Sequence, residues 1–325
     1  MSTERDALGA TARSTVTTVR EFGAMMLPFG DRATGAARIN ASLRTFAKPG
    51  TWFAPMWALL VGCVAAGAGA TPAGLGRVAL GLLLAGPLLC AFSQVVNDWF
   101  DRDVDRLNDP ERPTAANVMT PRTVGLLAAA LAIAALALAF ALGTLVFELA
   151  CGGLLLALAY SAPPLRLKAR SGWLANAACA FSYEGFAWIA GAAIFGRVTT
   201  GTIVLATLYS LASHGLMTLN DFKSYDGDLR LGLRSLPVML GRAGALRAAF
   251  VFIDVFQVLA ITYVAFQHAW IWAGVMAALL LVQLPMQRRL AGDPAGLAPW
   301  YCASAIPPLV WGMMASAIAT RSGGF

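Results

Sequence analysis

Charged residues are scarce in this chain, and their scarcity excludes an ordinary soluble domain. They make up 13% of the 325 residues, whereas hydrophobic residues make up 58% and the mean hydropathy is +0.66. A typical soluble domain carries about 25% charged residues. The composition therefore predicts an all-α, polytopic membrane protein.

Two further absences narrow the reading. The five cysteines lack the paired spacing of metal or redox motifs, and they are interpreted as small apolar packing residues. The first 50 residues contain no apolar run long enough for a cleavable signal peptide, so we expect the first span to direct insertion. We expect residues 1–50 to form a cytoplasmic segment, with either an interfacial amphipathic helix or a flexible tail over 12–47. Residues 51–325 are then one transmembrane domain.

Nine apolar stretches predict nine transmembrane helices around a central cavity. Each is close to the roughly 20 residues that about 30 Å of hydrocarbon requires. The stretches cover residues 52–70, 78–97, 123–142, 145–160, 173–195, 201–219, 246–267, 269–284 and 298–319.

Basic residues are distributed unevenly between the two sides of these spans. Of the 24 Lys and Arg, all but Arg77, Arg197 and Arg321 fall on one side. By the positive-inside rule this bias predicts a cytoplasmic N-terminus and a periplasmic C-terminus. The net charge of +7 is then explained by topology and by attraction to anionic membrane lipids, and nucleic acid is not an expected partner.

The first acidic segment, residues 97–109, follows the second span. Because a helix turns about 100° per residue, four of its polar side chains share one face. These four are Asn97, Asp98, Asp101 and Asp105. Asp103 points away and Arg102 lies on a flank. Carboxylate and amide oxygens suit Mg²⁺, although a solvated helix end is the simpler alternative.

A second acidic segment, residues 220–228, opens with the same Asn-Asp pair. On a continuous helix Asn220, Asp221 and Asp228 share a face, while Asp226 points away unless Gly227 ends the helix. Both acidic segments are predicted on the cytoplasmic side. Two such segments flanking one cavity would suit a diphosphate held through Mg²⁺. Lys223 either meets a phosphate oxygen or pairs with a neighbouring carboxylate.

A basic connection without acids, residues 160–170, lies on the same side. Arg166 and Lys168 are candidates for neutralising a diphosphate, with the positive-inside rule alone as the other explanation. Lys48, just before the first span, is a weaker candidate of the same kind.

At these residues the chain resembles the UbiA superfamily of intramembrane prenyltransferases. The resemblance covers about residues 45 to 320, and within the superfamily it points to the chlorophyll and bacteriochlorophyll synthases. The matching segments are Asn97–Asp105, Tyr160–Lys168, Asn220–Asp228, Arg234–Val238, Lys48–Trp57 and Tyr183–Gly185. Two positions depart from the pattern. Residues 112–117 read Arg-Pro-Thr-Ala-Ala-Asn in place of Arg-Pro-Ile-Pro-Ser-Gly, and Asp226 stands where a Glu is usual.

The resemblance implies Mg²⁺-dependent transfer of a geranylgeranyl or phytyl group from its diphosphate to the propionate carboxylate of bacteriochlorophyllide. The catalytic set would be Asn97, Asp98, Asp101, Asp105, Asn220, Asp221 and Asp228. The same residues without Asn220 would bind the metal. The substrate-binding set would be Lys48, Arg102, Tyr160, Arg166, Lys168, Glu184, His214 and Lys223. A carboxylate acceptor needs no strong base, which agrees with a chain that has only two histidines. We expect Glu184 near the pigment, and His214 either near the acceptor or in a packing role.

Three alternatives stay open. A family member with an aromatic acceptor, of the quinone or haem type, would use the same metal site. A divergent paralogue of low activity could handle pigment without turnover. A cation-coupled transporter is disfavoured, because charged residues are not spread through the spans. The resemblance places the chain in the inner, intracytoplasmic membrane. The acids inside spans, Glu148, Glu184 and Asp254, are expected to face protein or a cavity.

Overall fold

The computed structural model describes residues 49–108 and 113–325, and these residues form helices and no strand. In chain order the elements are α3 (Pro49–Ala65), α4 (Pro72–Leu83), η2 (Leu84–Cys90), α5 (Ala91–Asn108), α6 (Pro121–Leu142), α7 (Thr144–Ser161), α8 (Leu167–Arg170), α9 (Gly172–Ala180), η3 (Phe181–Phe186), α10 (Ala187–Ile194), α11 (Thr200–Asn220), η4 (Asp221–Ser224), α12 (Tyr225–Arg230), α13 (Leu236–Phe266), α14 (Trp270–Gly292) and α15 (Pro294–Gly323). The predicted all-α class is confirmed.

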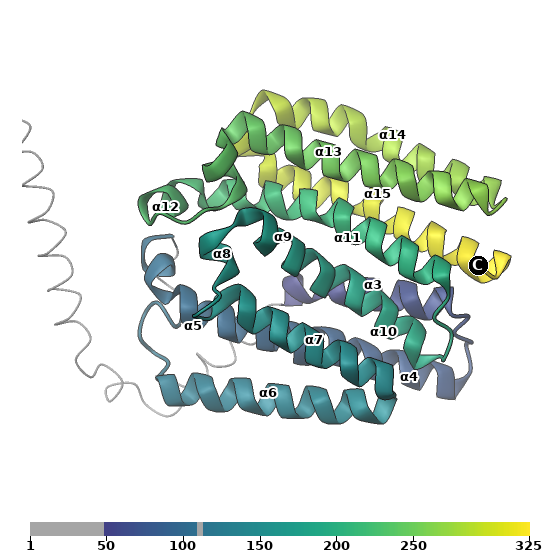
Figure 1. Cartoon of the computed structure of the whole chain (residues 1–325), viewed down its shortest axis with the longest axis horizontal. Helices are drawn as coiled ribbons and strands as arrows, with labels where there is room; N and C mark the ends of the chain where they lie inside the picture. Colours follow the sequence, from purple (N-terminus) through teal and green to yellow (C-terminus); the bar gives the residue numbers. More distant parts are fainter. Residues whose placement is uncertain (1–48, 109–112) are drawn as a thin grey trace, which may run out of the picture.

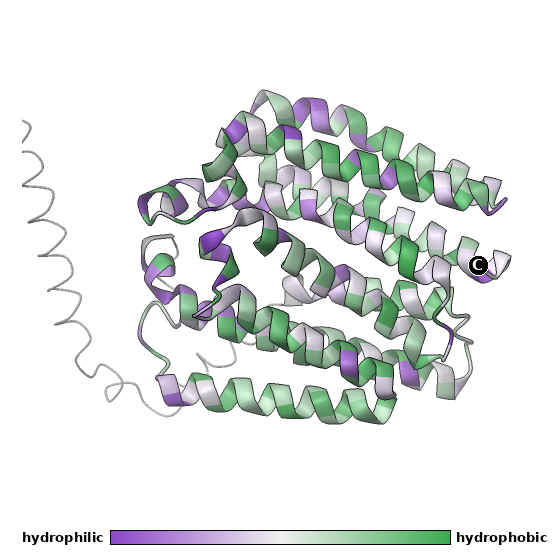
Figure 2. Ribbon diagram, viewed as in Figure 1, coloured by the Kyte–Doolittle hydropathy of each residue, from purple (hydrophilic) through white to green (hydrophobic). Residues whose placement is uncertain are grey.

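The long helices have the length and composition of membrane spans. Within the described ranges eight helical segments are long and apolar enough to cross a membrane, and α3 is a shorter apolar helix. Each of the nine predicted stretches overlaps one of these segments, so the chain is a multi-pass membrane protein. The first prediction ran too far, because α3 ends at Ala65. Apolar residues follow the long helices along most of their length (Figure 2).

The long helices run side by side in one bundle, with α11 near its centre (Figure 1). Helix α11 contacts α9, α13 and α15, and 67% of its span is buried. Helices α6 and α7 lie at the periphery, where only 22% of each span is buried. This arrangement leaves many side chains of α6 exposed at the edge of the bundle.

Side-chain caps fix several helix starts. The hydroxyls of Thr71 and Thr120 accept backbone N–H groups at the starts of α4 and α6, and each is followed by a proline at the first helical position. Thr199 and Thr202 form a capping box at the start of α11. These residues satisfy N–H groups that a helix start otherwise leaves unpaired.

Helices α3 and α10 touch backbone to backbone. A Cβ on Gly62 would overlap the carbonyl of Trp188, and one on Gly191 would overlap the carbonyl of Leu59. Small residues at such a crossing let two membrane helices approach closely. The glycine pair therefore joins α3 and α10 along one wall of the bundle.

Two π-helical segments, η2 and η3, interrupt long helices. In η2 the cause is Pro87, which lacks an N–H and crowds the carbonyl one turn earlier. In η3 no proline is present, and the segment presses Gly185 against Ser210 of α11. The second interruption therefore coincides with a close contact between helices and not with a proline.

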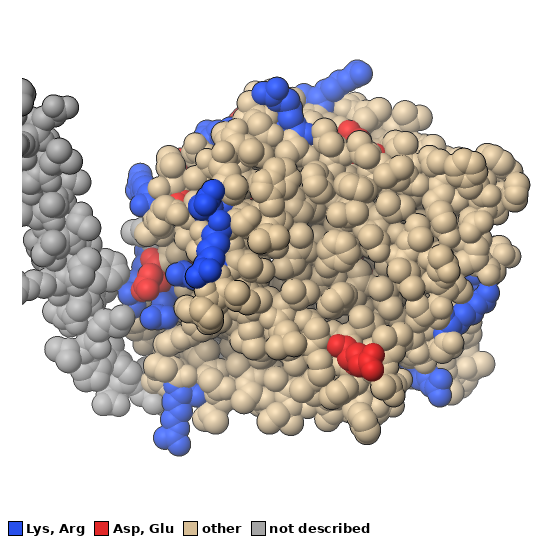
Figure 3. Space-filling view, in the orientation of Figure 1, with Lys and Arg blue, Asp and Glu red and all other residues tan. Residues whose placement is uncertain are grey.

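Charged side chains of both signs gather at the left end of the bundle in Figure 3, which is the end where Figure 1 labels α5, α8 and α12. Of the three acids expected to face protein, Glu184 is buried and Asp254 accepts a hydrogen bond from Gln287 Nε2 at 2.6 Å. The expectation for Glu148 was wrong, because this residue is exposed one turn into α7. A carboxylate so near a helix end can extend toward the membrane surface.

Candidate functional site

The first acidic segment lies on α5, which continues as a helix to Asn108. Three of its carboxylates are buried on one side, as the helical periodicity predicts: Asp98, Asp101 and Asp105 are 1%, 4% and 7% exposed. Asp103 points away, since its side chain is 56% exposed and pairs with Arg106 at 2.9 Å. Helix α5 thus presents a buried acidic face and a solvated one.

The second acidic segment is less regular than predicted. Helix α11 ends at Asn220, a 3₁₀ turn covers Asp221–Ser224, and α12 then runs through Gly227 without a break. Asp228 is nevertheless buried and accepts a hydrogen bond from Ser224 Oγ at 3.0 Å. Asp226 is solvated and contacts Arg242 at 3.5 Å.

The two acidic segments face one another. Helix α12 contacts α5, and the carboxylates of Asp228 and Asp101 interact electrostatically. Asp221 likewise interacts with Asp228. We call the group formed by Asp98, Asp101, Asp105, Asp221 and Asp228 the acidic site.

Lys168 lies between the two halves of the acidic site. Its Nζ forms an ion pair with Asp101 and lies 5.8 Å from the ring centre of Tyr160. The same ammonium also acts electrostatically on Asp221 and Asp228. The basic connection therefore folds over the acids, as expected, and Lys168 partly neutralises both segments.

Two arginines fix the segments on either side of α5. Arg166 fixes the basic connection, and Arg106 fixes the loop that contains Asn117. Arg166 Nη2 donates to the carbonyl of Phe100 on α5 at 3.1 Å. Arg106 Nη2 donates to Asn117 Oδ1 at 2.7 Å, and its Nε donates to the carbonyl of Ala115 at 3.3 Å. Asn117 has a φ of 56°, which explains how it occupies the place of the usual glycine, since Asn tolerates this region. The departure at 112–117 is thus accommodated at its last residue.

Sequence reasoning missed Asn176, a buried residue of α9. Its Nδ2 donates to Asp221 Oδ2 at 3.1 Å and lies 3.2 Å from Thr218 Oγ1. Asn176 therefore orients one carboxylate of the acidic site. The available signal was a lone amide in an apolar stretch, because a polar side chain inside a span usually has a specific partner.

The remaining predicted residues are not all brought together. Asn97 Nδ2 donates to Ser161 Oγ at 3.4 Å, and Arg102 folds back on the ring and carbonyl of Trp99. Asn220 and Lys223 are exposed, although Lys223 acts electrostatically on Asp221. Lys48 lies outside the described residues.

His214 lies in α11, and Glu184 lies in η3 and packs against α11; neither belongs to the acidic site. His214 stacks on Phe252 with ring centres 4.4 Å apart, and its Nε2 lies 3.2 Å from the carbonyl of Trp173. This arrangement is a packing role. Glu184 is buried in η3 beside Ser213 of α11.

The donor set of the acidic site fits a divalent cation that is shared with a phosphate. Asp101 Oδ1 is buried and has no hydrogen-bond partner. In the part of the chain that the structure describes, no three His, Cys, Asp or Glu side chains converge closely enough to enclose an ion. Mg²⁺ commonly takes one or two carboxylates and completes its shell with water and substrate phosphates. The arrangement suits that mode.

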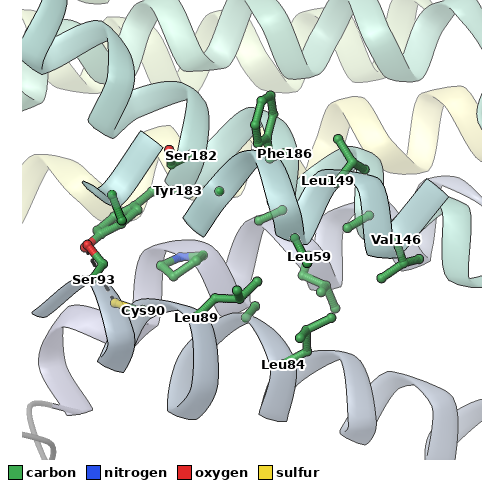
Figure 4. Close-up of a pocket in the computed structure, with 17 residues that line it drawn as sticks. Leu59, Leu84, Leu89, Cys90, Ser93, Val146, Leu149, Ser182, Tyr183 and Phe186 are labelled. Atoms are coloured by element: carbon green, nitrogen blue, oxygen red, sulfur yellow. Dashed lines mark hydrogen bonds between the residues drawn. The ribbon is translucent and has the colours of Figure 1, made fainter. Parts of the chain in front are cut away.

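An apolar cavity lies inside the bundle (Figure 4), and Ser93, which lines it, precedes Asp98 of the acidic site by little more than one turn of α5. Its walls come from α3, η2, α5, α7, η3 and α10, and both π-helical segments line it. The lining is mostly aliphatic, with Leu59, Leu84 and Leu149 among its larger side chains. Its polar members lie toward one end and are Cys90, Ser93, Ser182 and Tyr183.

Comparison with known proteins agrees with this architecture. The profile of the UbiA prenyltransferase family matches residues 55–306. The chain is 43% identical to the bacteriochlorophyll synthase 34 kDa chain of Chloroflexus aurantiacus over 271 residues, which cover 83% of this chain and 87% of the relative. It is 38% identical to the chloroplastic chlorophyll synthase of Arabidopsis thaliana, covering 84% and 73% of the two chains.

A solved structure shares the fold. It is a UbiA homologue from Archaeoglobus fulgidus bound to GPP and Mg²⁺, with a TM-score of 0.61 and 20% sequence identity. The match covers 87% of this chain and 99% of the other. The helical arrangement described above is therefore one already seen in a membrane protein.

Proposed function

The chain belongs to the UbiA prenyltransferase family, and on this premise we propose that it transfers a geranylgeranyl or phytyl group from its diphosphate to the propionate carboxylate of bacteriochlorophyllide. Its activity class is prenyl transfer. The observation that carries the proposal is that Lys168 and carboxylates from two separate segments meet beside an apolar cavity. A diphosphate with a long apolar tail needs both environments together. The similarity to bacteriochlorophyll and chlorophyll synthases supports the pigment as acceptor.

Mg²⁺ is the cation that we propose for the acidic site. Two ions are proposed, each held by one or two carboxylates and completed by water and the diphosphate; the residues that would supply the protein ligands are Asn97, Asp98, Asp101, Asp105, Asp221 and Asp228. When bound, Mg²⁺ neutralises the negative charge that develops on the leaving diphosphate. The shared fold with a homologue bound to GPP and Mg²⁺ is consistent with this assignment.

The protein's own side chains supply the rest of the chemistry. Lys168, next to Tyr160, stabilises negative charge on the leaving group, and Arg166 holds its connection against α5. The aliphatic lining of the cavity keeps water from the reacting carbon. The acceptor is a carboxylate at neutral pH, so no general base is required. Secondary candidates for substrate contact are Arg102, Lys223, Lys48, Asn220 and Glu184. His214 is left out of this set because it packs against Phe252 and Trp173.

The proposal includes a location and an orientation. The basic residues favour a protein of the inner, intracytoplasmic membrane with its N-terminus in the cytoplasm and its C-terminus in the periplasm. The acidic site then opens toward the cytoplasmic face. The hydrated diphosphate group of one substrate and the membrane-embedded pigment would meet at this face.

Incubation of purified protein in lipid vesicles with Mg²⁺, geranylgeranyl diphosphate and bacteriochlorophyllide tests the proposal. We expect the pigment ester, resolved by chromatography, and its loss on chelation of Mg²⁺. Prenylation of an aromatic quinone precursor in a parallel sample, with no pigment ester, would favour the second candidate function. Pigment binding without ester formation would indicate a paralogue of low activity.

A further inference from the structure

The polar end of the apolar cavity is built around Tyr183. Gln94 Nε2 donates to Tyr183 Oη at 3.1 Å, and Cys90 Sγ lies 3.6 Å from the same oxygen. Cys90 Sγ also lies 3.4 Å from the carbonyl of Thr51 on α3. Two elements, η2 and α5, therefore contact the phenol oxygen, and α3 holds Cys90 in turn. We call Cys90, Ser93, Gln94 and Tyr183 the polar neck.

The polar neck joins the cavity to the acidic site. Gln94 precedes Asp98 by one turn of α5, which corresponds to about 6 Å along the helix axis. On the other side, Cys179 is within electrostatic range of both Tyr183 and Asp221. The ring of Tyr183 lines the cavity itself, next to Ser93 (Figure 4). A substrate with its diphosphate at the acidic site and its tail in the cavity must pass this ring.

Two irregular helices create this position. Cys90 closes the π-helical segment η2, and Tyr183 lies within η3. The two segments meet across the cavity, joined through the Cys90–Tyr183 contact. π-Helical segments are rare and recur at functional sites. Here they place a polar, oriented aromatic residue in a wall that is mostly aliphatic and whose other aromatic residue, Phe186, has no polar group.

We propose that Tyr183 is a catalytic residue whose ring stabilises positive charge on the allylic carbon, and that Gln94 is the positioning residue that orients the ring. This inference rests on the proposed function. In the step concerned, the C1–O bond of the prenyl diphosphate breaks and its electron pair leaves with pyrophosphate. An oxygen of the acceptor carboxylate donates an electron pair to C1 and forms the ester. No proton and no further reactant is needed.

The test compares Tyr183→Leu, Tyr183→Phe and Gln94→Leu in vesicles with Mg²⁺, geranylgeranyl diphosphate and bacteriochlorophyllide. A ring facing a desolvated cation changes rates by about 10- to 30-fold. We expect Tyr183→Leu to lower kcat by that factor while KM for the diphosphate changes less than about twofold. Tyr183→Phe keeps the ring and should stay within about threefold of wild type. Gln94→Leu removes the same hydrogen bond as Tyr183→Phe and also keeps the ring, so it should match Tyr183→Phe.

A second readout separates catalysis from packing. Without the ring, more of the cation is captured by water, so the ratio of geranylgeraniol to ester should rise in Tyr183→Leu and not in Tyr183→Phe. Tyr263→Leu is the matched control, because Tyr263 Oη also accepts a hydrogen bond from a glutamine, Gln267 Nε2, at 3.1 Å. Tyr263 lies near the C-terminal end of α13, whereas the acidic segment 220–228 precedes the start of this helix. Its kcat and product ratio should equal those of wild type.

The outcomes distinguish this inference from the proposed function. Ester formation by wild type together with an unchanged kcat and product ratio in Tyr183→Leu would overturn the inference alone. If Tyr183→Leu does not fold, Tyr183→Met takes its place: a product ratio above that of Tyr183→Phe supports the inference, and an equal ratio overturns it. If wild type forms no pigment ester, pyrophosphate release from geranylgeranyl diphosphate replaces the assay. No release would overturn both claims.

Discussion

Replacing Lys168 with alanine removes the cation that lies between the two halves of the acidic site. In the described structure this ammonium is paired with Asp101 and acts on Asp221 and Asp228, and its side chain is only 16% exposed. A hydrogen bond between charged groups contributes about 1.5–3 kcal/mol. Loss of one such bond to a phosphate oxygen therefore corresponds to a rise of about 10- to 150-fold in the dissociation constant of the diphosphate.

Two binding measurements check this prediction. A thiolodiphosphate analogue reports diphosphate affinity, and quenching of pigment fluorescence reports bacteriochlorophyllide affinity. We expect Lys168→Ala to weaken the first far more than the second. Arg170→Ala is the matched control, since this exposed cation belongs to the same short helix, α8, and its effect should stay below about twofold. Equal losses of both ligands in Lys168→Ala would make Lys168 a structural residue and refute the reasoning.

Three further changes test the rest of the site. Asp98→Asn or Asp101→Asn should abolish prenyl transfer, with rates reduced by more than about 100-fold and normal membrane insertion, because a neutral amide is a poor ligand for Mg²⁺; wild-type turnover in either variant would contradict the metal assignment. Asn176→Leu should destabilise the protein by about 1–3 kcal/mol in thermal unfolding and lower kcat, because it leaves a buried carboxylate unpaired; unchanged unfolding and kcat would remove Asn176 from the site. Asn117→Gly should keep activity and Asn117→Val should lose stability by about 1–2 kcal/mol, since only the second is strained at positive φ; equal stability in these two variants would show that the loop conformation does not matter.

The acidic face of α5 could be predicted because it depends only on local helical geometry. Asp98, Asp101 and Asp105 are buried and Asp103 is solvated, as a turn of about 100° per residue requires. The number of membrane-spanning stretches could also be predicted from the lengths of the apolar segments, and the family could be predicted from the sequence motifs. The 3₁₀ turn after Asn220 could not, since it breaks the periodicity on which the prediction relied.

Contacts between distant segments were the part that the sequence left open. Lys168 and Asp101 are 67 positions apart, and Asn176 and Asp221 are 45 apart. Composition indicated that a basic connection and acidic segments share one side of the membrane, but not which side chains meet. The polar neck is another such case, because Gln94 and Tyr183 are 89 positions apart and the π-helical segments that join them carry no simple spacing rule.

The backbone contact between α3 and α10 decides where the cavity can widen. The apolar cavity has a volume of about 60 Å³, whereas pockets for drug-sized ligands enclose about 300–1,000 Å³. A methyl group at Gly62 or Gly191 already has no room, so α3 and α10 cannot slide past one another without a clash of carbonyls. Space for a long hydrocarbon tail must therefore come from the other walls of the cavity, which η2, α5, α7 and η3 form.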